Sequence, residues 1–153
     1  PIADKAMVVI ALAVIIGFSG MVAWILLPAT VILFREVFVS GLREYLGDTA
    51  GTLKVTSLAK WKTTVQMVAI ATLFAQGVFE HYIAAIAYGM DDGMVRAVLD
   101  GEAEDVHGLR PLSWGLTFAW YGGLVLLWVA AVLTAITGWD YFRKALPVLR
   151  EPA

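Results

Sequence analysis

The chain has 153 residues, of which 60% are hydrophobic and 16% are charged, and its mean hydropathy is +0.79. Soluble domains contain about 25% charged and about 45–50% apolar residues, and a core this small cannot hide the apolar surplus. The net charge of −2 argues against a nucleic-acid-binding protein, and the absence of cysteine excludes disulfides and thiolate chemistry. The composition therefore predicts an integral membrane protein.

Three long runs of the sequence, residues 6–34, 63–79 and 111–139, carry no charged side chain. A helix needs about 20 apolar residues to cross the hydrocarbon core of a bilayer. Glycine and serine at residues 17–20 interrupt the first run, which indicates two helices there. The sequence predicts an all-α, polytopic membrane helix bundle with four spans, at about residues 3–18, 22–46, 60–80 and 113–142.

The four predicted spans place the basic residues unequally on the two sides of the membrane. All lysines and arginines except Arg96 and Arg110 fall on the side that carries both ends of the chain. Cytoplasmic segments are enriched in these residues, so we expect both ends in the cytoplasm. Residues 80–112 would then form an outer acidic loop with a formal charge of −5 and a short helix around residues 94–99. We expect residues 1–153 to form a single membrane domain.

The second span ends with charged residues that share one sector of the helix. Arg35 and Arg43 lie about 80° apart on the helical wheel, with Glu36 beside Arg43. Ion pairing and snorkelling to the interface explain such a group. An anion clamp explains it equally well, because the planar fork of arginine suits phosphate. Spacing alone leaves both interpretations open.

Two further groups of polar residues lie where predicted spans begin. Lys62 and Gln66 share a face at the start of the third span, and such a polar stripe faces either a cavity or another helix. Lysines at this position also serve as a topology signal or contact anionic lipid. Asp4 and Lys5 stand at the start of the first span, where they form either an interfacial pair or a functional carboxylate with its neighbour.

Four short motifs follow one another along the chain. They are P-I-A-D-K at residues 1–5, R-E-V with L-R-E at 35–37 and 42–44, K-W-K-T-T-V-Q at 60–66, and G-W-D-Y at 138–141. In this order they resemble the D-P-x-A-D-K, R-E…L-R-E, K-x-K-T-x-x-Q and G-W-D-Y motifs of the CDP-alcohol phosphatidyltransferase family. Within that family, the chain most resembles the members that form phosphatidylglycerol phosphate.

The resemblance implies transfer of a phosphatidyl group from CDP-diacylglycerol to sn-glycerol 3-phosphate, which releases CMP. It implies a cytoplasmic-membrane enzyme with its active site on the cytoplasmic face and a divalent metal, Mg²⁺ or Mn²⁺. By this match, Asp4 would be the general base and a metal ligand. Arg35, Arg43 and Lys62 would hold the phosphate of the acceptor, with Lys5 as a weaker candidate.

The chain departs from the family pattern in its metal-binding signature. That signature reads D-x-x-D-G-x-x-A-R, eight residues, then G-x-x-x-D-x-x-x-D, and only its last aspartate is present, as Asp4. The other aspartates, and two of the six spans expected of the fold, would precede Pro1. We therefore expect these residues alone to be inactive.

Two alternatives remain open at this point. The first keeps the family and changes the alcohol acceptor, to an inositol phosphate or a second lipid. The second is a non-catalytic membrane scaffold whose charged residues only set topology. Small residues four apart in the last span, Ala131 with Ala135 and Thr134 with Gly138, predict close helix packing. A homodimer is a further expectation from the same spacing.

Overall fold

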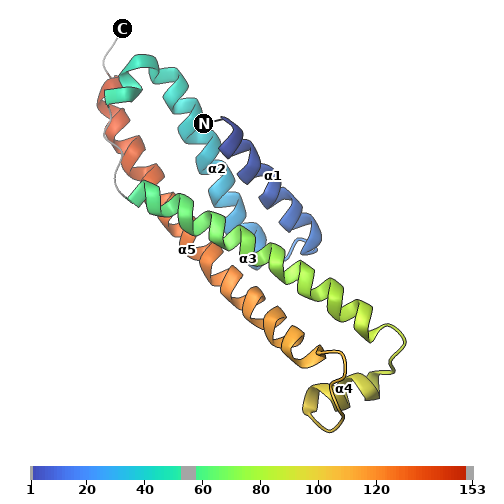
Figure 1. Cartoon of the computed structure of the whole chain (residues 1–153). Coiled ribbons are helices and arrows are strands. Elements are labelled where there is room, and N and C mark those ends of the chain that lie inside the picture. Colours follow the sequence, from blue (N-terminus) through green and yellow to red (C-terminus); the bar gives the residue numbers. More distant parts are fainter. Residues whose placement is uncertain (1, 53–57, 151–153) are drawn as a thin grey trace.

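The computed structural model describes residues 2–52 and 58–150, except for the side chains of residues 2–4, 52 and 58–60. All regular structure within these ranges is helical, so the predicted all-α class is confirmed (Figure 1). The elements are α1 (Ile2–Phe18), α2 (Ala23–Leu46), the 3₁₀ helix η1 (Gly47–Thr52), α3 (Leu58–Ala87), α4 (Asp92–Asp100) and α5 (Leu109–Arg150).

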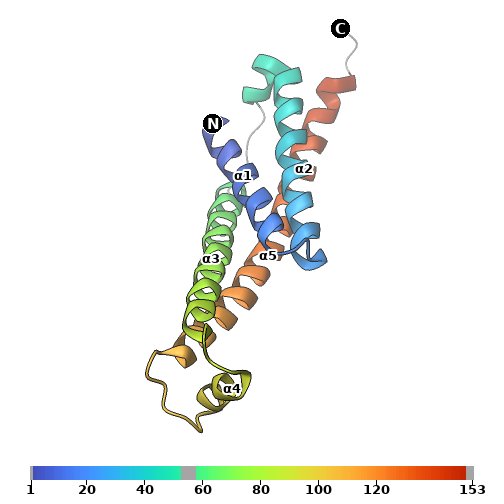
Figure 2. The same cartoon turned by 90° about the vertical axis from the view of Figure 1, so that its right-hand side faces the viewer.

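The helices form an elongated bundle in which α3 and α5 make the most extensive contact and run antiparallel (Figures 1 and 2). Helix α2 packs on α5, whereas α1 touches α2 and α3 more sparsely. Helix α4 lies at the end of the bundle opposite to the start of α1 and the end of α5 (Figure 2). The core consists of buried apolar residues from four helices: Val8, Leu12, Ile15, Ile25, Ala29, Ile32, Ala69, Ile70, Leu73, Leu127, Ala130 and Ala131.

The first apolar run is divided into two helices where its glycines and serine predict a turn. Helix α1 ends at Phe18 and α2 begins at Ala23. Between them, Gly20 and Met21 both have positive φ angles, 67° and 60°, which reverse the chain direction. Only glycine adopts this conformation without a steric penalty, so Gly20 makes the reversal easier.

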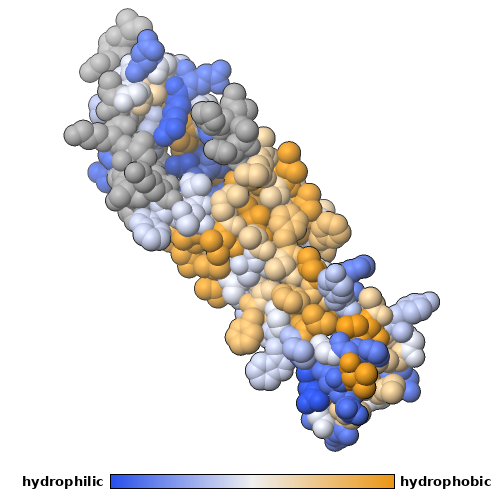
Figure 3. Space-filling view, viewed as in Figure 1, coloured by the Kyte–Doolittle hydropathy of each residue, from blue (hydrophilic) through white to orange (hydrophobic). Residues whose placement is uncertain are grey.

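Three of the described helices are long and apolar enough to cross a membrane. These are Ala23–Gly51, Trp61–Ala87 and Leu109–Arg150, whereas the apolar part of the first helix, Lys5–Phe18, is shorter. In the view of Figure 3, apolar residues form a band across the middle of the molecule, with hydrophilic residues at both ends. This distribution is typical of a bundle whose middle lies in hydrocarbon.

The acidic segment between α3 and α5 is shorter than the predicted 80–112, because both helices continue beyond their apolar runs. It covers residues 88–108 and contains α4, which matches the short helix expected around residues 94–99. The Asp91 carboxylate caps α4 by accepting the Met94 backbone N–H at 2.7 Å.

Asp105 caps the start of α5. Its carboxylate accepts the backbone N–H groups of Leu109 and Arg110 at 2.7 and 2.9 Å. The bond from the Arg110 backbone is the main cause that holds the pKa of Asp105 below its ordinary value. The bond from Leu109 and the nearby Arg110 guanidinium lower this pKa further. The carboxylate therefore stays ionised and compensates the positive end of the α5 dipole.

Pro28 lies inside α2 and leaves one backbone carbonyl without its helical donor. Proline has no N–H, so the Trp24 carbonyl, four residues earlier, cannot form its usual bond within the helix. The indole N–H of Trp128 on α5 donates to that carbonyl at 3.0 Å, and the two tryptophan rings pack at 6.3 Å. One side chain of α5 thus satisfies a backbone group that the membrane interior would leave unpaired.

Substituting Trp128 by phenylalanine removes this donor while keeping an aromatic ring. We expect W128F to lower the free energy of unfolding by about 1–3 kcal/mol, because the Trp24 carbonyl loses its partner. Thermal unfolding in detergent micelles measures the loss. W139F is the matched control, because the described residues show no hydrogen bond from the Trp139 indole. Equal melting temperatures of the two variants would contradict the role of Trp128.

Candidate active site

The largely buried carboxylate of Glu36, on α2, forms ion pairs with two cations. These are Arg35 of the same helix and Lys62 of α3. The Arg35 Nη1 lies 3.2 Å from Glu36 Oε1, and Lys62 Nζ of α3 binds the same oxygen. The Glu36 and Lys62 side chains are only 10% and 7% exposed. Buried charges are costly without partners, so this shared oxygen makes the burial of both cations tolerable.

Helix α1 joins the same group through Lys5. The Lys5 ammonium donates to Ser40 Oγ at 2.6 Å, and Ser40 Oγ donates to the Glu36 backbone carbonyl at 2.5 Å. Ser40 stands four residues after Glu36, so its hydroxyl reaches back along α2. Three helices therefore converge on one polar cluster: Lys5 from α1, Arg35, Glu36 and Ser40 from α2, and Lys62 from α3.

Helix α5 closes the cluster with two residues of one face. A Cβ atom placed on Gly138 would lie 2.8 Å from Arg35 Cγ, so the arginine stem rests against the α5 backbone. Three residues later, the Tyr141 ring lies under the Arg43 guanidinium, whose central carbon is 5.1 Å from the ring centroid. Arg43 therefore packs against α5 and makes a cation–π contact there.

Positive charge exceeds negative charge among the described side chains of this region. Arg35 and Lys62 share the one carboxylate of Glu36, while Lys5 contacts Ser40 and Arg43 contacts Tyr141. Several buried polar atoms here and on the adjoining turns of α3 and α5 have no hydrogen-bond partner among the described residues: Arg35 Nε, Gln66 Oε1, Thr134 Oγ1 and Tyr141 OH. A surplus of cations with a free N–H donor is the arrangement that an anion such as phosphate would complete.

The structure brings together three of the five predicted site residues, Arg35, Lys62 and Lys5. Arg43 lies two turns further along α2, against Tyr141. The backbone of Asp4 belongs to the first turn of α1, directly before Lys5, but its side chain lies outside the described residues. Among the described side chains, no group of three or more His, Asp or Glu residues could hold a metal ion.

Two features of the cluster were not predicted. Ser40 was missed, although a hydroxyl one turn after Glu36 is a signal that could have been noticed. The contact of Gly138 with Arg35 was also missed, although Gly138 belongs both to the G-W-D-Y motif and to the small residues of the last span. Thr134 and Gly138 are both buried within the chain, so this pair packs helices of the same molecule.

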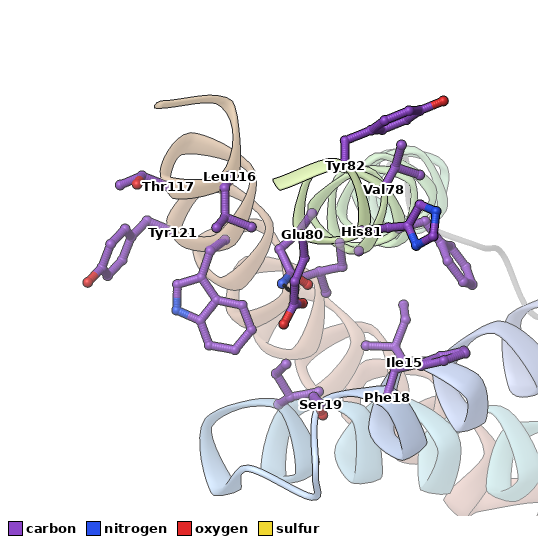
Figure 4. Close-up of a pocket in the computed structure, with 16 residues that line it drawn as sticks. Ile15, Phe18, Ser19, Val78, Glu80, His81, Tyr82, Leu116, Thr117 and Tyr121 are labelled. Atoms are coloured by element: carbon purple, nitrogen blue, oxygen red, sulfur yellow. Dashed lines mark hydrogen bonds between the residues drawn. The ribbon is translucent and has the colours of Figure 1, made fainter. Parts of the chain in front are cut away.

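A pocket of about 990 Å³ lies elsewhere, in the half of the bundle nearer to α4. It opens between the end of α1 and the facing sides of α3 and α5 (Figure 4). Gln76 donates to Glu80 at 2.9 Å on its wall. The pocket shares no residue with the polar cluster, so its lining and the cluster are separate features of the described structure.

Comparison with known proteins gives a family for the chain. A sequence model described as CDP-alcohol phosphatidyltransferase matches residues 1–91, which include Lys5, Arg35, Glu36 and Lys62. No solved structure matches the chain.

Several curated relatives carry the name CDP-diacylglycerol–glycerol-3-phosphate 3-phosphatidyltransferase. The relative from Cereibacter sphaeroides is 58% identical over 99% of this chain and 68% of its own length. The relative from Rickettsia bellii is 31% identical over 94% of this chain and 59% of its own length. The relative from Haemophilus influenzae is 41% identical over 48% of this chain and 40% of its own length. The chain thus spans between two fifths and about two thirds of these relatives, and it belongs to the CDP-alcohol phosphatidyltransferase family.

Proposed function

We propose that the protein transfers a phosphatidyl group from CDP-diacylglycerol to sn-glycerol 3-phosphate, forming phosphatidylglycerol phosphate and CMP. The observation that carries this proposal is the buried surplus of cations around Glu36, within the segment that matches the family. The name of the Cereibacter sphaeroides relative, 58% identical over nearly the whole chain, supports glycerol 3-phosphate as the acceptor.

In the proposed reaction, a hydroxyl oxygen of glycerol 3-phosphate attacks the β-phosphorus of CDP-diacylglycerol. A new phosphorus–oxygen bond forms, the bond to CMP breaks, and the hydroxyl proton is released. Arg35 and Lys62 would bind the phosphate of the acceptor, because their positive charges are only partly compensated by Glu36. Arg43 would contact the same phosphate from the next turns of α2, with Lys5 as a weaker contributor.

The proton of the attacking hydroxyl would go to the carboxylate of Asp4. Its backbone lies directly before Lys5, whose ammonium belongs to the polar cluster, so Asp4 lies in the first turn of the helix that reaches the proposed acceptor site. A carboxylate is also the ligand type that Mg²⁺ and Mn²⁺ prefer, and such an ion would neutralise the pyrophosphate of the donor. The described side chains supply no group of three ligands, so its further ligands would come from other residues.

We further propose that α1 is a fourth membrane span. We also propose that both ends of these residues, with the active site, face the cytoplasm. The helix is 17 residues long and carries charge only in its first turn, which reaches the lower limit of about 17 residues for a span. The start of α1 and the last turns of α5 lie at the end opposite to α4 (Figure 2). Enrichment of lysine and arginine at that end supports its cytoplasmic placement.

Alanine substitution of Arg35, Arg43 or Lys62 tests the acceptor site. Each variant, expressed from its natural gene, is expected to raise the KM for glycerol 3-phosphate. Loss of the largely buried charge of Arg35 or Lys62 costs about 2–4 kcal/mol, and loss of the exposed Arg43 is expected to cost less. Initial rates in isolated membranes, at varied acceptor and saturating CDP-diacylglycerol, give this value. R143A is the matched control, because Arg143 is an exposed cation near the end of α5.

An unchanged KM in all three variants would contradict the proposed acceptor site. The same assay with an inositol phosphate or a lipid alcohol decides between acceptors. Turnover with one of these and none with glycerol 3-phosphate would replace the proposed acceptor while keeping the family. Absence of turnover with every acceptor would favour the alternative of a non-catalytic membrane scaffold.

Asparagine at position 4 tests the proposed base. D4N is expected to lose turnover while CDP-diacylglycerol still binds, because an amide cannot accept the proton. Turnover is followed as CMP release, and donor binding by retention of labelled CDP-diacylglycerol on the purified protein. D48N is the control, since Asp48 lies in η1 and outside the cluster. Turnover of D4N close to that of D48N would remove Asp4 from this role.

Thiol labelling tests the orientation of α5 and of the ends that flank it, because this sequence contains no cysteine. A membrane-impermeant maleimide added to intact spheroplasts is expected to label E102C and to reach R150C only after permeabilisation. Both positions are exposed, so burial within the protein does not protect either of them. The parent protein is the control for background. Labelling of R150C in intact spheroplasts would overturn the proposed orientation.

A further inference from the structure

Gly138 is distinguished from the other glycines of α5 by what it touches. Gly122 has open space around it, whereas a Cβ on Gly115 or Gly123 would meet the apolar side chains of Phe79 or Leu73 at 2.9 and 2.8 Å. At Gly138 the neighbour is a charged residue, Arg35, whose Cγ would lie 2.8 Å from the added carbon. Gly115 and Gly123 therefore allow α3 and α5 to pack closely. Gly138 instead leaves room for the Arg35 stem against the α5 backbone, and we call this contact the seat of Arg35.

The close approach of the α5 backbone at Gly138 and the ion pair with Glu36 hold different parts of the Arg35 side chain. The Arg35 Nη1 is held by Glu36, while its aliphatic stem lies on the α5 backbone. The Nε atom is buried and has no hydrogen-bond partner among the described residues. The guanidinium is thus held in place, while its Nε–H remains available to donate to an acceptor oxygen such as one of a phosphate.

Tyr141 holds the second arginine of α2 in a comparable way. Its ring is buried and lies 5.1 Å from the central carbon of the Arg43 guanidinium, within the range of about 6 Å for a cation–π contact. Tyr141 follows Gly138 by three residues and therefore projects from the same face of α5. Both arginines of α2 thus rest on one face of one helix.

We propose that this α5 face, formed by Gly138 and Tyr141, positions Arg35 and Arg43 for the phosphate of the acceptor. Gly138 and Tyr141 are positioning residues: they act through the arginines and need not touch the substrate. The inference rests on the proposed function, since it assigns the arginines to the acceptor. It also gives the glycine and the tyrosine of the G-W-D-Y segment separate physical roles, a seat and a ring platform.

Alanine at position 138 tests the seat, with two matched glycine controls on the same helix. In G138A the added methyl displaces Arg35, and the KM for glycerol 3-phosphate is expected to rise by about tenfold to about 100-fold, as for misplaced positioning groups. The kcat is expected to change less. G122A adds a methyl in open space, and G123A adds one against Leu73, so we expect both to retain the KM even where G123A lowers the melting temperature.

Two substitutions of Tyr141 test its cation–π contact with Arg43, which we call the ring platform. This test does not depend on whether G138A folds. Y141F keeps the ring and is expected to retain the KM, whereas Y141L removes the cation–π contact and is expected to raise it. A KM of G138A equal to that of G123A, in protein with a normal melting profile, would overturn the seat. Equal KM values for Y141F and Y141L would overturn the platform. If G138A does not fold, the tyrosine pair decides the inference.

The R35A variant, assayed in parallel, separates this inference from the proposed function. A raised KM in R35A with an unchanged KM in G138A overturns only the positioning role of α5. An unchanged KM in R35A overturns the acceptor site itself, and the positioning role with it. Raised KM values in R35A, G138A and Y141L, with normal values in Y141F, G122A and G123A, support both.

Discussion

The Glu36 carboxylate is the interaction on which the polar end of the bundle depends. A charged side chain inside a membrane protein needs a partner, and Glu36 provides one oxygen to both Arg35 and Lys62. Through Ser40, the same turn of α2 also receives Lys5 from α1. One acid cannot neutralise these cations, so the site remains positively charged. That residual charge is the physical reason why an anionic substrate fits there.

The rest of the fold supplies a rigid frame for this charge arrangement. Helices α3 and α5 approach closely through Gly115 and Gly123, and the indole of Trp128 ties α5 to α2 at the Trp24 carbonyl. The helices that carry Lys62 and the α5 face are therefore fixed relative to α2. Helix α1 is held more sparsely, so Lys5 depends on its bond to Ser40 for its position.

The helical class, the division of the first apolar run and the short helix α4 were predictable because they depend on local composition and on turn residues. The cationic candidates could be named from charges at the ends of apolar runs. The seat of Arg35 on Gly138 could not, because it depends on how closely α2 and α5 approach, which no spacing within one helix reveals. The ends of α3 and α5 around the acidic segment could not be placed from the apolar runs alone, because both helices continue with polar residues.

The length of α5 has a consequence for the membrane in which the protein works. Its 42 residues extend about 63 Å, roughly twice the hydrocarbon thickness of about 30 Å. Such a helix matches its bilayer by tilting or by extending into the headgroups, and the balance changes with lipid chain length. Because α5 is fixed relative to α2, a change of tilt would reorient the bundle as a unit and leave both arginines on their α5 contacts. The depth of the polar cluster in the membrane would then follow the hydrophobic mismatch.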